Sequence, residues 1–220
     1  SDVDGDTLSS VTVSALSGSD GTFSLNGTAI TGSTTVTKTQ IDNGQLTFAP
    51  DSNENGSNYN TFTFTVNDGT TNSSSSYTMT VDVTAVNDAP TASNNTVTTN
   101  EDTDHTFAAS EFGFTDVDGD SLDHVTIETL PSNGTLLLSG VAVDAGDEIS
   151  AADITNLVFR PAANANGSDY DSFTFSVNDG TADSSSTYTM TVDVDAVNDA
   201  PTASDNTVTT NEDTDHTFAA

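Results

Sequence analysis

The stretch FTFSVNDGTADSSSTYTMTVDV, residues 173–194, decides the fold of this chain. It contains two runs in which every second residue is apolar and the residues between are mostly hydroxyl side chains, the pattern of strands with one buried face. The apolar members are Phe173, Phe175, Val177, Tyr188, Met190, Val192 and Val194. Between the runs, Asn178-Asp179-Gly180 supplies residues that favour a tight turn. The stretch therefore predicts a β-hairpin.

The same hairpin occurs earlier as FTFTVNDGTTNSSSSYTMTVDV, residues 62–83. The stretch that follows it, AVNDAPTASNNTVTTNEDTDHTFAA at 85–109, returns at 196–220 with one change, Asn94 to Asp205. Its prolines and glutamates give a period of 111 (201−90 and 212−101). A fixed period of this length indicates a tandem array of domains.

The period predicts three parts: residues 1–88 as a repeat without its N-terminal portion, 89–199 as a complete repeat, and 200–220 as the start of a third. The motif DVDGD at 2–6 recurs at 116–120, well inside the complete repeat. We therefore expect the chain to be a window from a longer array.

Further short strands are predicted in the complete repeat, and residues 150–153 can cap a single helical turn. These strands are Thr96–Thr99, Val125–Leu130, Gly134–Leu138 and Leu157–Arg160. Long helical periodicity is absent. Short strands about ten residues apart with turn signals between them predict an all-β chain of tandem antiparallel Greek-key β-sandwiches.

The charge balance is the most unusual property of the composition. Thirty-four acidic residues stand against two basic ones, Lys38 and Arg160, which gives a formal net charge of −32. Such a chain repels phosphate, so nucleic-acid binding is not expected. Either the acids are spread over the surface, or they converge on sites for a hard divalent cation that prefers oxygen ligands. Their grouping in short recurring motifs favours the second explanation.

Other classes of protein are disfavoured by what the sequence lacks. Without cysteine there can be no disulfide and no thiolate metal site. No apolar run is long enough to cross a membrane, so this segment is not expected to insert into one. The paired carboxylates of a glycoside hydrolase are possible in principle, but the chain has no tryptophan and no Gly-x-Ser-x-Gly motif. We do not expect an enzyme.

Three acidic motifs recur. In DVDGD, carboxylates at alternate positions around a glycine can turn inward on one ion, although a solvated Asp-Gly turn explains the motif equally well. The other two are the linker NDAP at 87–90 and 198–201, and NED at 100–102 and 211–213. Each of these can be an ordinary turn or an exposed acidic loop. An EF-hand is not expected, because Glu128 comes one position too late and lies in a strand-like string without flanking helices.

In combination the motifs resemble the bacterial cadherin-like tandem repeats of large surface proteins. The resemblance covers the whole chain: VDVDAVNDAP at 192–201 is similar to the cadherin linker, DVDGD to its Asp-x-Asp element, NED to its early glutamate, and YDSFTFSVNDG at 170–180 to the strand that ends in a calcium-binding aspartate.

The resemblance implies that Ca²⁺ binds between modules, held by the linker and by acids of the modules on either side. The implied calcium ligands are Asp2, Asp4, Asp68, Asn87, Asp88, Glu101, Asp116, Asp118, Asp120, Asp169, Asp171, Asp179, Asp195, Asn198, Asp199 and Glu212. Repeat one has Asn58, Asn60 and Thr84 where repeat two has Asp169, Asp171 and Asp195. We therefore expect the first junction to bind fewer or weaker calcium ions than the second.

The favoured function is a calcium-rigidified extender in a giant extracellular or cell-surface adhesin, whose partners are the neighbouring repeats of the same chain. One alternative is a building segment of an extracellular filament, in which other copies make lateral contacts or exchange strands. The other is a module that binds a glycan or ice. The near identity of the repeated segments favours a scaffold.

Overall fold

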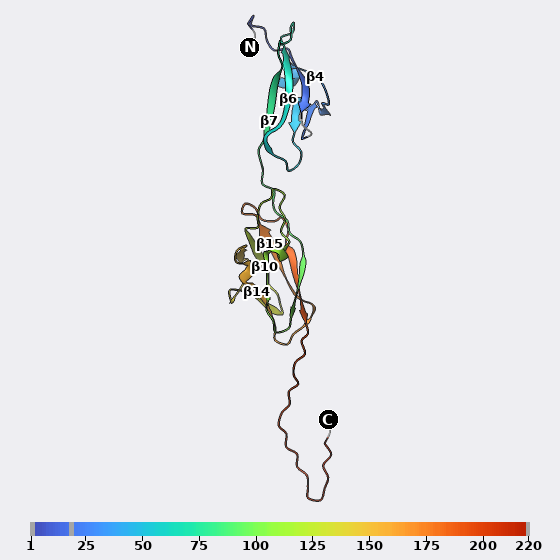
Figure 1. Cartoon of the computed structure of the whole chain (residues 1–220), viewed down its shortest axis with the longest axis vertical. Coiled ribbons are helices and arrows are strands. Elements are labelled where there is room, and N and C mark those ends of the chain that lie inside the picture. Colours follow the sequence, from blue (N-terminus) through green and yellow to red (C-terminus); the bar gives the residue numbers. More distant parts are fainter. Residues whose placement is uncertain (1–2, 18–19, 219–220) are drawn as a thin grey trace. The chain divides into compact units, whose positions relative to one another are not determined.

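The computed structural model describes residues 3–17 and 20–218 (Figure 1). Nearly all of its regular structure is β-strand, and the all-β class predicted from the alternating patterns is confirmed. Within these described ranges, no helix has the length and apolar character needed to cross a membrane.

The strands of the first repeat form two sheets, of order β4-β1-β6-β7 and β3-β2-β5. Their bounds are β1 Ser10–Ser17, β2 Thr22–Leu25, β3 Thr28–Ala29, β4 Thr34–Thr37, β5 Leu46–Ala49, β6 Gly56–Asn67 and β7 Tyr77–Val83. The two sheets meet where Phe23 of β2 packs edge-on against Phe62 of β6, with ring centroids 5.0 Å apart. Val13, Ile30 and Val36 complete this small buried cluster.

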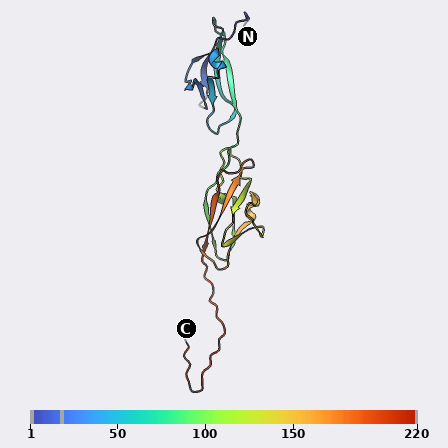
Figure 2. The same ribbon diagram turned by 180° about the vertical axis from the view of Figure 1, so that it is seen from behind.

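The strands of the second repeat form two larger sheets, of order β13-β10-β15-β16-β8 and β12-β11-β14-β9 (Figure 2). Their bounds are β8 Asn95–Asn100, β9 His105–Thr106, β10 His124–Thr129, β11 Gly134–Leu138, β12 Val141–Ala142, β13 Glu148–Ser150, β14 Leu157–Pro161, β15 Gly167–Asn178 and β16 Tyr188–Asp195. All four additional strands predicted from sequence are found within a residue or two of their expected limits.

The predicted hairpins are β6–β7 and β15–β16. Phe173 lies opposite Met190, and Phe175 lies opposite Tyr188. The connection is longer than a tight hairpin, because Asn178-Asp179-Gly180 turns the chain back to an isolated bridge between Asn178 and Asp183 before β16 begins. Gly180 takes a φ of +95°, which a glycine adopts without strain.

One strand pair departs from the antiparallel pattern. β8 lies along β16 in the parallel direction, with Val97 opposite Val192. Parallel neighbours need a long connection between them, and here almost the entire second repeat separates β8 from β16. Local turn signals carry no information about such a pairing.

Three short helical elements complete the description. Residues 150–153 do form a turn, in which the backbone N–H of Asp153 donates to Ser150 Oγ, and a 3₁₀ turn, η2 Ile154–Asn156, follows. A second 3₁₀ turn is η1 Ala109–Phe112. The helix α1 Lys38–Asp42 was not anticipated, although Thr37 and Gln40 form a capping box that the sequence displays.

By its contacts the chain divides into two compact units. One comprises Ser1–Ala92, Phe114–Thr126 and Ser176–Thr187, and the other comprises Ser93–Gly113, Ile127–Phe175 and Tyr188–Ala220. The first unit therefore groups the linker with two loop-bearing segments of the second repeat. The repeat limits at residues 88 and 199 stay predictions.

Candidate metal centre

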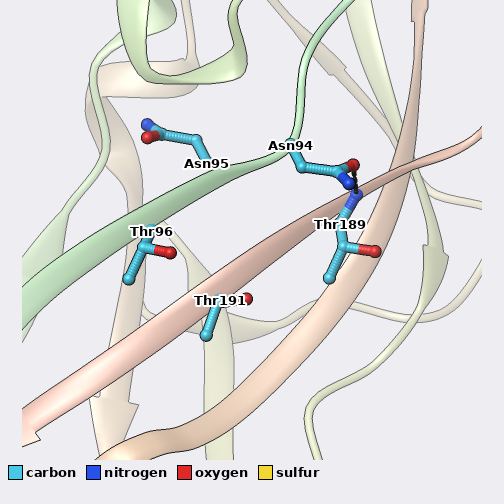
Figure 3. Close-up of a pocket in the computed structure, with 5 residues that line it drawn as sticks. All are labelled: Asn94, Asn95, Thr96, Thr189 and Thr191. Atoms are coloured by element: carbon cyan, nitrogen blue, oxygen red, sulfur yellow. Dashed lines mark hydrogen bonds between the residues drawn. The ribbon is translucent and has the colours of Figure 1, made fainter.

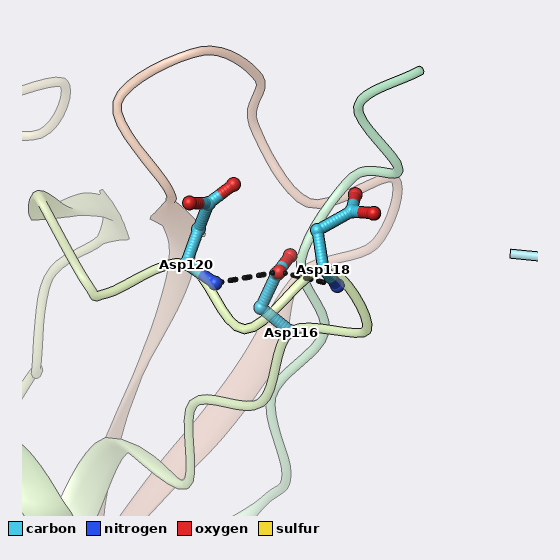
Figure 4. A group of neighbouring side chains, drawn as sticks. All are labelled: Asp116, Asp118 and Asp120. Atoms are coloured by element: carbon cyan, nitrogen blue, oxygen red, sulfur yellow. Dashed lines mark hydrogen bonds between the residues drawn. The ribbon is translucent and has the colours of Figure 1, made fainter. Parts of the chain in front are cut away.

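The DVDGD loop of the second repeat folds around the carboxylate of Asp116. Asp116 Oδ1 accepts hydrogen bonds from the backbone N–H groups of Asp118, at 2.9 Å, and Asp120, at 3.0 Å (Figure 4). Gly119, with a φ of +85°, makes this bend possible. The loop therefore brings three carboxylates together, as the spacing predicted, and their ligand atoms lie within 4.8 Å of one another.

The second oxygen of Asp116 distinguishes this loop from an ordinary turn. Asp116 Oδ2 is buried and accepts no hydrogen bond from the protein. A buried oxygen of a carboxylate without a partner is costly. A cation among the three carboxylates would satisfy it.

The linker is attached to the same end of the second repeat. The backbone N–H of Asp88 donates to Asp118 Oδ2 at 2.7 Å, and Asn87 Nδ2 donates to Asp179 Oδ2 at 3.1 Å. Two residues later, Pro90 is buried and Thr91 pairs with Thr115 through two backbone hydrogen bonds of 2.8 Å. The structure thus brings together the linker, DVDGD and the hairpin turn that the sequence had linked only by resemblance.

Asp179 is held firmly in the hairpin turn. Its Oδ1 accepts from the backbone N–H groups of Thr181, at 2.6 Å, and Ala182, at 2.7 Å. The hydrogen bond from the Ala182 N–H, aided by Asn87 and Thr181, outweighs burial and lowers the pKa of the Asp179 carboxyl. Asp68 repeats this turn with Thr70 and Thr71, and its pKa is lowered by the same kind of backbone donors.

No lysine or arginine is left to neutralise this acidic end. Lys38 pairs with Asp42, and Arg160 holds Asp104 through two hydrogen bonds of 2.9 and 2.6 Å. The Arg160 guanidinium lowers the pKa of the Asp104 carboxyl. Since these are the only two such residues in the sequence, positive charge at the acidic loops must come from outside the chain. A donor set made only of carboxylate, amide and backbone oxygens suits Ca²⁺.

The opposite end of the second repeat is organised around Glu101. This carboxylate is buried, at 6% exposure. Its Oε1 accepts from the backbone N–H of Val197 and its Oε2 from Asn166 Nδ2 at 2.9 Å. The Glu101 N–H in turn donates to the backbone oxygen of Asp195. The predicted ligands Glu101 and Asp195 are therefore neighbours beside the second linker.

The remaining predicted ligands at this end are placed differently. Asp169 is exposed with a φ of +46°, and its backbone N–H donates to Asp193 Oδ1. Asn198 bonds to the backbone oxygen of Asp199, and both are exposed. Across residues 3–17 and 20–218, the Asp116 loop is the one place where three or more acidic or histidine side chains approach closely enough to share an ion.

Asp171 performs a task that the sequence did not suggest. Its two oxygens accept from the backbone N–H groups of Ser132, Asn133, Gly134 and Ser172, at 2.7 to 2.9 Å. Burial raises the pKa of the Asp171 carboxyl, but these four donors lower it more, so that it lies below its ordinary value. The carboxylate thereby orders the loop before β11. If the Asp171 carboxylate is occupied by these hydrogen bonds, the second junction has one predicted calcium ligand fewer.

The other expected ligands fall in the outer parts of the chain. Asp2 lies outside the described residues, while Asp4 and Glu212 are exposed.

Three residues that support the acidic ends were not predicted from the sequence. They are Asn166, Asp193 and its counterpart Asp82, whose carboxylate accepts from the Asn58 N–H at 2.7 Å. A signal for Asn166 existed in the recurring Asn-Gly-Ser of residues 166–168 and 55–57.

The family comparisons agree with this architecture. Residues 87–194 match the model of the bacterial Ig domain, and residues 1–83 match the model of a cadherin-like domain. No curated protein matches the chain. Domains of these two kinds are generally extracellular, of adhesion type and typically non-enzymatic.

Among solved structures, this chain is similar to part of two endo-fucoidan hydrolases of glycoside hydrolase family 107. MfFcnA4 is 21% identical with a TM-score of 0.32, over 88% of this chain and 24% of that chain. MfFcnA9 is 20% identical with a TM-score of 0.26, over 87% and 29%. The chain thus spans under a third of either enzyme, and so weak a likeness says nothing about activity. From the two family matches and the all-β sheets that they cover, we conclude that the chain is a tandem of bacterial cadherin-like, immunoglobulin-type repeats.

Proposed function

We propose that this chain is a calcium-stiffened extender of a large extracellular adhesion protein. The observation that supports this most directly is the attachment of the linker to the acidic loops, through Asp88 to Asp118 and through Asn87 to Asp179. A cation held by Asp116, Asp118 and Asp120 would lie beside these contacts. The linker would then be fixed by the same ion that fills the site.

The mechanical effect follows from charge and from backbone stiffness. Without cations the acidic side chains repel one another, and the hydrogen bonds of Asn87 and Asp88 must hold the linker against that repulsion. Bound Ca²⁺ would cancel it and restrict the linker, whose flexibility Pro90 already reduces. Separately folded modules would then behave as a rod. Extracellular calcium sites of this kind have dissociation constants of about 10⁻⁴ to 10⁻³ M.

Calcium titration calorimetry tests the site itself. Asp116→Asn keeps the oxygen that accepts from Asp118 and Asp120 but replaces a charged oxygen by an amide. We expect affinity at this site to fall about tenfold or more, because fewer anionic ligands remain. Asp144→Asn removes an equal charge from an exposed loop and serves as the control. Equal binding by both variants would exclude Asp116 as a ligand.

Small-angle X-ray scattering tests the stiffening. With calcium the chain should show a larger and better defined maximum dimension than with a chelator, and Asp116→Asn should reduce this difference. An unchanged maximum dimension on chelation would refute the extender model even if calcium binds.

A further inference from the structure

The outer face of the five-stranded sheet of the second repeat carries a shallow polar groove. Its volume is about 570 Å³, within the range of roughly 300–1,000 Å³ found for small-ligand sites. The groove is lined by residues of β16, of β8 and of the position before β8, namely Asn94, Asn95, Thr96, Thr189 and Thr191 (Figure 3). All five belong to one compact unit. None of them is a predicted calcium ligand.

Strand alternation explains why hydroxyl groups form this groove. Met190 of β16 is 0% exposed, so Thr189 and Thr191 on either side of it face away from the core. On β8, Val97 is buried and Thr96 before it is exposed. Thr191 lies opposite Thr96 in the parallel ladder. These two side chains therefore stand next to each other, on strands about 4.8 Å apart.

Both amides of the groove are fixed by backbone groups. Asn94 Oδ1 accepts from the backbone N–H of Thr189 at 2.8 Å, which leaves its Nδ2 free to donate to a ligand. Asn95 Nδ2 donates to the backbone oxygen of Glu111 at 2.9 Å. In the part of the chain that the structure describes, the hydroxyls of the three lining threonines bond to no protein group. The groove thus offers polar groups that are already positioned, which lowers the entropic cost of binding.

The chemistry of the lining selects the class of ligand. None of the five lining residues is charged or aromatic, while the chain as a whole has a net charge of −32. That charge repels an anionic polymer, and a cationic ligand finds no carboxylate among the lining residues. An apolar ligand would leave the amides and hydroxyls without partners. A neutral sugar fits, because each of its hydroxyls both donates and accepts a hydrogen bond.

The two copies of the repeated stretch differ within this groove. Residues 85–109 and 196–220 are identical except at one position, which is Asn94 in the first copy and Asp205 in the second. An amide donates and accepts hydrogen bonds, whereas a carboxylate only accepts them. The single difference between the copies therefore removes the one amide donor that the groove leaves free for a ligand.

We propose that the outer face of β8 and β16 binds a neutral oligosaccharide, through the amide of Asn94 and the hydroxyls of the three lining threonines. The hydroxyl face continues onto β15, where Ser172 lies opposite Thr191. The occupant is therefore a chain of sugar rings rather than a single ring. One groove binds with millimolar affinity, because it is shallow and has no aromatic ring to stack on a sugar. This binding does not depend on calcium at the Asp116 loop.

Heteronuclear NMR of the full chain, without added calcium, tests the class of ligand. Laminarihexaose and maltohexaose are the neutral probes, and an alginate oligosaccharide of similar length is the anionic one. A neutral probe should shift the amide signals of Thr96, Thr189 and Thr191 in a saturable way, and alginate should not. No saturable shift with either neutral probe, or equal shifts with alginate, overturns the proposal. Thermal hysteresis without sugar binding would assign the face to ice and overturn it as well.

Substitutions in the groove test the assigned contacts. Thr189→Val with Thr191→Val keeps the branched side chains but removes two hydroxyls, so affinity should fall about tenfold or more. Asn94→Asp, which copies Asp205, should lower affinity about fivefold because the amide donor is lost. Thr135→Val, at an exposed threonine of β11, is the matched control and should bind like the wild type.

The unfolding temperature of each variant shows whether lost binding reflects a lost fold. If the double variant does not fold, Asn94→Asp alone decides the result, since its carboxylate can still accept from the Thr189 N–H. Wild-type affinity in both groove variants, or an equal loss of affinity in Thr135→Val, shows that the sugar does not bind in this groove.

Discussion

At the scale of single residues, position 171 shows how one place in the fold can support two chemistries. Asp171 accepts four backbone hydrogen bonds from the loop before β11 and from its own neighbour. In the first repeat this position is Asn60, whose amide donates to the Asp20 backbone oxygen while its own oxygen accepts from the Thr61 N–H. The acid was expected to differ from the amide in calcium binding. The structure gives another reason for the difference between the two residues, because each side chain suits the backbone groups that it bonds in its own sandwich.

We predict that Asp171→Ala lowers the free energy of unfolding of the second repeat by about 3 kcal/mol, because four backbone N–H groups lose an anionic acceptor that is itself buried. Urea unfolding measures the loss, and hydrogen exchange should show faster exchange at Ser132, Asn133 and Gly134. Asp144→Ala, at an exposed position, should change neither quantity. A stable Asp171→Ala variant with normal exchange would return Asp171 to the list of plausible ligands.

The lowered pKa of Asp171 gives this stabilisation a defined pH dependence. A carboxyl whose pKa is lower in the folded state than in the unfolded state stabilises fully above its ordinary pKa of 3.8, and loses the effect as the pH falls through the folded value. The difference in unfolding free energy between the wild type and Asp171→Asn should therefore be constant near neutral pH and shrink below 3.8. A difference that grows in acid would show that the assigned hydrogen bonds are wrong.

At the scale of elements, the pairing of β11 with β14 depends on a close approach at Gly134. Gly134 lies opposite Pro161 at the start of this ladder. A Cβ atom there would lie 2.2 Å from Cζ of Phe159, a ring with 0% exposure. Gly21 has the same relation to Phe48 in the first repeat. In both sandwiches a glycine therefore leaves room for a phenylalanine ring, that of Phe159 in the core of the second repeat and that of the partly buried Phe48 in the first.

We predict that Gly134→Ala destabilises the second repeat by about 1–3 kcal/mol, because a buried ring with little room must move. Gly32→Ala provides a matched control, since a Cβ atom at Gly32 meets nothing within 4 Å. Thermal unfolding of the two variants makes the comparison. If both unfold like the wild type, the core around Phe159 is looser than the structure indicates.

At the scale of the whole molecule, the excess of acid is the dominant property. Both basic residues are engaged in ion pairs with Asp42 and Asp104. The pair of Arg160 is partly exposed and is expected to contribute only about 0–1 kcal/mol. Repulsion among the other acids must therefore be relieved by ions from solution. Monovalent salt acts by screening, whereas a divalent ion held by Asp116, Asp118 and Asp120 acts by specific binding.

We predict that CaCl₂ raises the unfolding temperature more than NaCl at matched ionic strength. At a calcium concentration ten times the dissociation constant, one site contributes about 1.4 kcal/mol of stabilisation. Differential scanning calorimetry with both salts measures this, and Asp116→Asn should abolish most of the excess effect of calcium. Identical shifts with both salts would leave screening as the sole cause.

The sequence by itself determined the β class, the period and most strand positions, because alternation and turn residues are local properties. That DVDGD and the linker lie at one acidic end was implied only by the resemblance to cadherin-like repeats. Only the tertiary structure decided that β8 runs parallel to β16, that Asp171 serves a loop and that Asp116 Oδ2 is left buried without a donor. These depend on which distant segments meet. The identical letters of β7 and β16 illustrate the difference: both form a strand of the same alternating pattern, yet Met190 is buried in the second repeat, where β8 pairs with β16, and Met79 is exposed in the first.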